Sequence, residues 1–155
     1  MKQENIEAIY QKVANKLNEM IPESWDKVYL YAEPNDGVSS VSFYYSPQGK
    51  NQFEFSTEIV SKFAINKNDF YYYEYQLCEL FEELQNEFRI NNQEVWTNLT
   101  YIMEENGKYK VDYDYSDLSD TDDYERQIIW EYKYMRFEPP IERKRDREII
   151  EKYLK

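Results

Sequence analysis

Alternating segments joined by short turn signals constrain the fold of this chain most. Residues suited to a core recur at every second position in Val28–Ala32, Val41–Tyr45 and Tyr109–Tyr115. A period of two is the pattern of a β-strand with one covered face. Asn35-Asp36-Gly37 and Asn106-Gly107 are hairpin turn signals. Strands joined by hairpins run antiparallel, so the sequence predicts an antiparallel sheet.

Two further segments bring the expected sheet to about five strands. Asn51–Ser56 follows the turn Pro47-Gln48-Gly49 and places Phe53 and Phe55 on one face. Residues 95–103 carry apolar side chains at both odd and even positions, and thus on both faces of a strand, with Trp96 on the face opposite Val95. We therefore expect that segment to be an interior strand, covered on part of each face.

Two long segments instead have helical spacing, because apolar residues recur at steps of three and four. In residues 5–20 the stripe consists of Ile6, Ile9, Tyr10, Val13, Leu17 and Met20. In residues 67–89 it consists of Phe70, Tyr73, Leu77, Phe81, Leu84 and Phe88. Pro22 and Asn91-Asn92 mark the ends of these helices.

The last forty residues predict two more helices. Ser119 or Asp120 is the expected N-cap of a helix to about Met135, and Pro139-Pro140 lies beyond its end. Residues 143–155 are expected to close the chain with a charged helix over Asp146–Leu154. The element order is then α-β-β-β-α-β-β-α-α, an α+β fold of one antiparallel sheet packed by helices, in a single domain over residues 1–155.

The residue types exclude several kinds of chemistry. The chain has no His and one Cys among 155 residues, so it has no imidazole catalysis, internal disulfide or Cys-based zinc site. We find no signal peptide and no run of about 18 apolar residues that spans a membrane. No nucleotide-binding or nucleophile motif is present. We expect a cytoplasmic protein without a cofactor.

The charge of the chain is strongly negative and unevenly distributed. The formal net charge is −12, and residues 133–155 carry eight Lys or Arg against five acids, which leaves −15 on residues 1–132. A surface of this sign repels nucleic acid and anionic membranes and attracts a basic partner. The alternative is that acidity only keeps the protein in solution.

Acidic residues are densest between positions 112 and 125, where seven occur in fourteen residues: Asp112, Asp114, Asp117, Asp120, Asp122, Asp123 and Glu125. A calcium loop from Asp112 lacks the required Gly at its sixth position and ends in Asp rather than Glu. Asp112 and Asp114 share a strand face, about 6.5–7 Å apart, which fits an acid–base pair. The remaining interpretations are a negative binding surface and an ordinary solvated face beside a helix N-terminus.

A second acidic set lies on the outer side of the helix over residues 67–89. It consists of Glu79, Glu82, Glu83 and Glu87. Tyrosines near these acids supply contact area at low entropic cost when they are exposed. The candidates are Tyr71, Tyr72, Tyr75 and Tyr124, and ordinary packing is the alternative for each.

Beyond these patterns, several stretches of the chain resemble the YezG/EsaG-like family, in the same order. They are residues 9–15 (IYQKVAN), 21–33 (IPESWDKVYLYAE), 94–100 (EVWTNLT), 110–115 (KVDYDY) and 125–134 (ERQIIWEYKY). The resemblance implies an immunity protein, or antitoxin, of Gram-positive bacteria. Such proteins pair with LXG toxins of type VII secretion, typically nucleases, and they need no cofactor.

The resemblance and the charge together lead to one functional hypothesis. A nuclease domain holds a polyanion in a basic cleft, so an acidic inhibitor matches it electrostatically. We expect the chain to mask that surface of its cognate toxin, with no direct contact to nucleic acid. The toxin-facing residues are expected to be Asp112, Asp114, Asp117, Asp120, Asp122, Asp123, Glu79, Glu82, Glu83, Glu87 and Tyr124. The alternatives are an adaptor that holds a basic protein before export and a carboxylate-based metal-dependent enzyme.

Overall fold

The computed structural model describes residues 3–35 and 38–155. The chain forms two compact units: the N-terminal unit ends at Ser116, and the C-terminal unit begins at Asp117. Asp36 and Gly37 of the first hairpin signal lie outside the described residues. The N-terminal unit contains α1 (Gln3–Met20), β1 (Trp25–Glu33), β2 (Ser40–Pro47), β3 (Glu54–Phe55), the 3₁₀ helix η1 (Ser56–Glu58), α2 (Ile59–Lys62), α3 (Lys67–Ile90), β4 (Asn98–Glu104) and β5 (Tyr109–Asp114). The C-terminal unit contains α4 (Asp123–Met135) and α5 (Lys144–Leu154).

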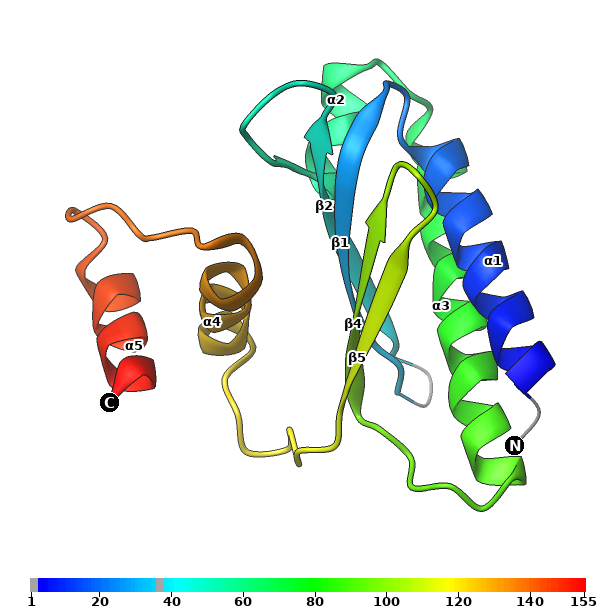
Figure 1. Ribbon diagram of the computed structural model, residues 1–155. Helices are drawn as coiled ribbons and strands as arrows, with labels where there is room; N and C mark the ends of the chain where they lie inside the picture. Colours follow the sequence, from blue (N-terminus) through cyan, green and yellow to red (C-terminus); the bar gives the residue numbers. More distant parts are fainter. Residues whose placement is uncertain (1–2, 36–37) are drawn as a thin grey trace. The chain divides into compact units, whose positions relative to one another are not determined.

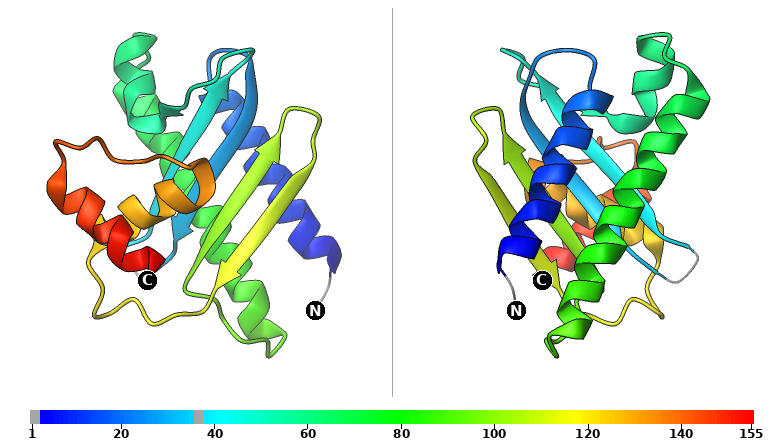
Figure 2. Two further views of the ribbon diagram at one scale, coloured as in Figure 1. Left: turned by 60° about the vertical axis from the view of Figure 1, so that its left-hand side comes forward. Right: turned by 90° about the vertical axis from the view of Figure 1, so that its right-hand side faces the viewer.

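The sheet of the N-terminal unit has the strand order β3-β2-β1-β4-β5, and its neighbouring strands pair antiparallel. Strand β1 is central, with Leu30 opposite Phe43 of β2 and Tyr101 of β4. Helices α1 and α3 lie side by side across one face of this sheet (Figures 1 and 2). The predicted α+β fold and its element order are confirmed.

The core lies between these two helices and the sheet. All six residues of the predicted α1 stripe are buried, and five of the six in α3 are buried while Tyr73 is half-buried. The sheet contributes the alternate residues Val28, Leu30 and Ala32 of β1, with Leu99 and Tyr101 of β4. Because neighbours in a strand point to opposite faces, Asp112 and Asp114 of β5 lie on the face away from the helices.

Two parts of the N-terminal unit differ from the sequence-based expectation. Strand β3 spans only Glu54–Phe55, and the chain then turns into η1 and α2, whose few residues carry too little periodicity to predict. Trp96 was expected to face away from Val95 within a strand. It precedes β4 instead and is fully buried in the same core as Leu99, with its ring 5.6 Å from that of Tyr113.

The C-terminal unit is a pair of helices with a small apolar contact of its own. Ile128 of α4 packs with Ile149 and Ile150 of α5. The predicted N-cap was wrong, because Asp122 caps α4: its carboxylate accepts a hydrogen bond from the Tyr124 amide at 3.0 Å. The expectation that residues 1–155 form a single domain stays a prediction.

Candidate functional site

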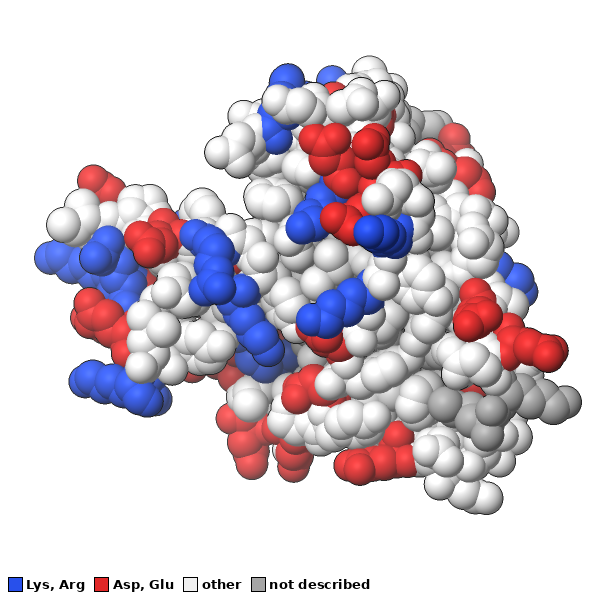
Figure 3. All heavy atoms as spheres, in the orientation of Figure 1, with Lys and Arg blue, Asp and Glu red and all other residues white. Residues whose placement is uncertain are grey.

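The acidic run that is continuous in the sequence is divided between the two units. Asp112 and Asp114 belong to the sheet of the N-terminal unit, whereas Asp117–Asp123 begin the C-terminal unit. Glu79, Glu82 and Glu83 form a third group, on the exposed side of α3. On the face shown in Figure 3, Lys and Arg side chains are prominent over the C-terminal unit.

The two strand aspartates are engaged with their neighbours. Asp114 accepts hydrogen bonds from the Ser116 hydroxyl and from Asn98 Nδ2 at 2.8 Å. Burial by itself raises the pKa of Asp114, but these hydrogen bonds outweigh burial and the pKa is lowered. Asp112 lies 3.6 Å from the ammonium group of Lys110. A general acid needs a raised pKa, so the environment of Asp114 does not favour the acid–base interpretation.

The acids at the start of the C-terminal unit also have local partners. Asp117 accepts hydrogen bonds from the Ser119 hydroxyl and amide, which lower its pKa. Asp122 caps α4 and accepts a hydrogen bond from Arg145 at 2.9 Å, and Asp123 pairs with Arg126. Part of the negative charge in this run is therefore neutralised within the unit.

Tyr124 serves the packing of the same unit. Its hydroxyl donates a hydrogen bond at 2.6 Å to Asp146, which is only 3% exposed, and accepts one from Arg143 at 3.2 Å. Arg143 also pairs with Asp146, and the guanidinium of Arg145 lies over the Tyr124 ring at 5.0 Å. A buried carboxylate needs such partners. Asp146, unremarkable in a charged stretch of sequence, is thus the centre of a network that sequence reasoning missed.

The outer face of α3 presents aromatic and acidic side chains together. Tyr71, Tyr72 and Tyr75 are exposed, followed by Glu79, Glu82 and Glu83 in the next turns. Glu82 accepts a hydrogen bond from the Ser39 hydroxyl. Glu87 is half-buried and accepts a hydrogen bond from Asn5 Nδ2 at 3.4 Å, so it belongs to the contact between α1 and α3.

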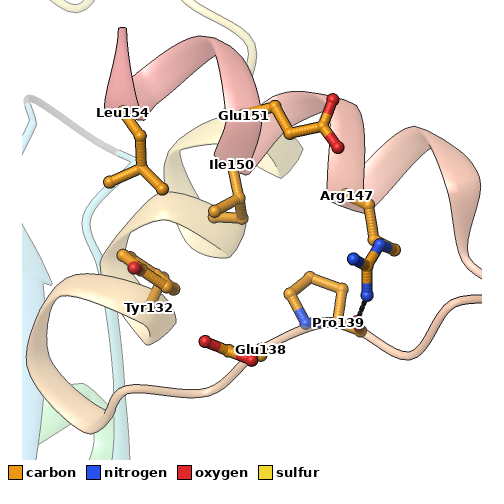
Figure 4. A pocket seen from close by; sticks show the side chains of 7 residues that line it. All are labelled: Tyr132, Glu138, Pro139, Arg147, Ile150, Glu151 and Leu154. Atoms are coloured by element: carbon orange, nitrogen blue, oxygen red, sulfur yellow. Dashed lines mark hydrogen bonds between the residues drawn. The ribbon is translucent and has the colours of Figure 1, made fainter.

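The described residues contain no metal-binding cluster, and the C-terminal unit has a small pocket. Within residues 3–35 and 38–155, no three acidic or Cys residues come close enough together to hold a metal ion. A pocket of about 170 Å³ lies beside α4 and α5 (Figure 4). It is lined by Tyr132, Glu138, Pro139, Arg147, Ile150, Glu151 and Leu154. That volume is below the roughly 300 Å³ at which ligand pockets begin. In the described ranges, no helix is both long and apolar enough to cross a membrane.

Comparison with known proteins decides the family. A model of the YezG-like immunity proteins matches residues 6–151. The chain belongs to the YezG-like immunity protein family. It is 42% identical over 148 residues to "Immunity protein YezG" of Bacillus subtilis, an alignment covering 94% of this chain and 97% of that protein. It is 40% identical over 149 residues to the protein of the same name from Bacillus spizizenii, covering 95% and 91%.

A third relative carries a different name. "Type VII secretion system protein EsaG" of Staphylococcus aureus is 31% identical over 156 residues, covering 99% of this chain and 96% of its own length. The resemblance to the YezG/EsaG-like family is thereby confirmed. Membership in an immunity family indicates an antitoxin, which acts by binding a toxin, and the chain is not an enzyme.

Proposed function

We propose that this immunity protein neutralises a cognate secreted nuclease toxin of the LXG type by masking its basic nucleic-acid-binding or active-site surface. It acts in the cytoplasm, by stoichiometric binding and without a cofactor. The geometry supports a binding role because the acids of the chain are spread over exposed strand, loop and helix surfaces. Such surfaces make contacts with another macromolecule, whereas a catalytic site is concave.

The charge of the N-terminal unit is the observation that carries this proposal. Residues 1–116 hold twenty acids against ten Lys or Arg, a net charge of −10, while residues 117–155 hold eleven against nine. A nuclease must bind a polyanion, so its substrate surface is positive, and opposite charge accelerates the encounter of the two proteins. Fast association favours immunity, because damage begins once the toxin is free in the cell.

Co-expression tests the proposal directly. The C-terminal domain of an LXG nuclease toxin from the same strain is expressed in bacteria, alone and with the chain. We expect the chain to restore growth and to protect cellular nucleic acid from degradation. The matched control carries Leu30→Asp, which places an unpaired carboxylate in the core and unfolds the binding surface. Growth arrest with the folded wild-type chain present would contradict the proposal.

The same experiment separates immunity from an export role. The name of the S. aureus relative connects it with a secretion system, which favours an adaptor as the second candidate. An adaptor holds a basic protein before export but leaves the toxin active. Binding of the toxin domain without any growth rescue or loss of nuclease activity is therefore the result that assigns an adaptor.

A further inference from the structure

The outward face of α3 gathers more exposed aromatic surface than a solvated helix requires. Tyr71, Tyr72 and Tyr75 expose 52%, 59% and 61% of their area. Single exposed aromatic residues are normal, but neighbouring ones on one helix face indicate a contact surface. Tyrosine suits this use because its rigid ring buries a large area while its hydroxyl finds a polar partner.

These residues form one continuous strip on the helix. Steps of three and four from Tyr71 and Tyr72 lead through Tyr75 and on to Glu79, Glu82, Glu83 and Ile90, all exposed. The strip lies opposite the buried residues Phe81 and Leu84. From Tyr71 to Ile90 it is about 28 Å long at 1.5 Å per residue. That length is comparable with the width of a standard protein interface of about 800 Å² per partner.

The charges of the strip define what it can bind. Glu79 and Glu83 accept no hydrogen bond and form no ion pair with any residue in the described parts of the chain. Nucleic acid would bring negative charge against them, and so would the N-terminal unit of a second copy of this chain, with its net charge of −10. Both contacts cost free energy. The occupant that fits is a protein surface bearing Lys and Arg.

The acids of the Asp117–Asp123 segment differ in this respect. Asp117 and Asp122 accept hydrogen bonds within their own unit, and Asp123 is paired with Arg126. A partner that binds these carboxylates must first replace those internal contacts, which lowers the net gain from each new contact. Glu79 and Glu83 of α3 have no hydrogen bond or ion pair among the described residues to replace, so a partner that binds them does not pay this cost.

We propose that the outward face of α3 is the main docking surface for the cognate toxin, with Tyr72 and Tyr75 as anchors and Glu79 and Glu83 beside them. The toxin meets this face through a positively charged surface. This inference rests on the proposed function and extends it by naming the surface that carries the contact.

Calorimetric titration with the catalytically inactivated C-terminal domain of an LXG nuclease toxin from the same strain tests the surface. The first variant, Tyr72→Ala/Tyr75→Ala, removes the anchors while improving helix propensity, and we expect its Kd to rise about 30-fold or more. The second, Glu79→Lys/Glu83→Lys, reverses two charges, and we expect at least a tenfold rise that shrinks at high salt. Circular dichroism verifies that both variants are folded.

The control for the charge change is Glu7→Lys/Glu105→Lys. It alters the net charge of the same unit by the same amount at two exposed positions outside α3, and we expect less than a threefold effect. Wild-type affinity in both α3 variants would overturn the docking surface and leave the proposed function standing. Equal weakening by the control would also overturn it, since net charge alone would then explain the effect. Failure of the wild-type chain to bind the domain would remove the proposed function itself.

Discussion

Arg145 donates a hydrogen bond to Asp122 Oδ2 at 2.9 Å and so joins the first turn of α5 to the N-cap of α4. The other carboxylate oxygen, Oδ1, accepts from the Tyr124 amide. One side chain therefore satisfies a helix terminus and an ion pair together. A residue that looked available for a partner in the sequence has a structural role in the folded unit.

The two roles of Asp122 can be separated by substitution. Asp122→Ala removes both the cap and the ion pair, and we expect α4 to lose about 1 kcal/mol of local stability. Asp122→Ser keeps a capping oxygen and loses only an exposed pair, which is worth well under 1 kcal/mol. Amide hydrogen exchange across Asp123–Met135 measures the difference. Equal exchange rates in the two variants would show that the cap does not stabilise α4.

Tyr124 gives a second prediction for the same unit. Tyr124→Phe leaves the buried Asp146 carboxylate without the hydroxyl that donates to it at 2.6 Å. Hydrogen bonds to charged groups are worth about 1.5–3 kcal/mol, and we expect a loss of that order in the stability of the α4–α5 pair. Tyr153→Phe is the control, because the Tyr153 hydroxyl contacts no described residue by hydrogen bond. Hydrogen exchange of α5 that is unaltered by Tyr124→Phe would refute this role.

Acid should destabilise the protein in part through Asp114. Its pKa is lowered from 3.8 in the folded state, so its contribution to stability is present above that value and is lost as the pH falls through the folded pKa. We expect Asp114→Asn to lose less unfolding free energy than wild type between about pH 5 and pH 3 in urea titrations. Identical slopes for Asp114→Asn and wild type would contradict this prediction.

The Cys78 thiol should react slowly with alkylating reagents. Burial, followed by the negative charges of Glu82 and Glu74, raises its pKa from 9.0 to about 11. The thiolate is the reactive form, so alkylation by iodoacetamide at pH 8 should be roughly 100-fold slower than in the urea-unfolded chain. Mass spectrometry of timed samples measures both rates. Similar rates in the folded and unfolded chains would exclude this environment for Cys78.

The periodic parts of the fold were predictable because local pattern and core position agree in them. The α1 stripe from Ile6 to Met20 is buried throughout, and Val28, Leu30 and Ala32 form the covered face of β1. Trp96 was assigned to the wrong face because side chains alternate between the two faces only within a strand. Strand β4 begins two residues after Trp96, at Asn98. The short α2 was missed because four residues cannot show a helical period.

The partners of the acidic run could not be read from the sequence. Asp122 and Arg145 are 23 residues apart, and nothing in either local pattern indicates that α5 returns to the N-terminus of α4. The density of acidic residues in the sequence predicted a negative surface. It did not predict that Arg126 and Arg145 neutralise part of that charge within the C-terminal unit. On α3 the helical period by itself separates the buried side from the exposed one, so the sequence placed Glu79 and Glu83 correctly.

Displacement of nucleic acid from the toxin tests most directly whether the chain masks the nucleic-acid-binding surface. A fluorescent oligonucleotide is bound to the inactivated nuclease domain of the same LXG toxin, and the immunity protein is added while anisotropy is recorded. We expect the oligonucleotide to be released completely when one equivalent of a tightly binding chain has been added. A stable complex of all three components, with the anisotropy unchanged while the chain is bound, would contradict it.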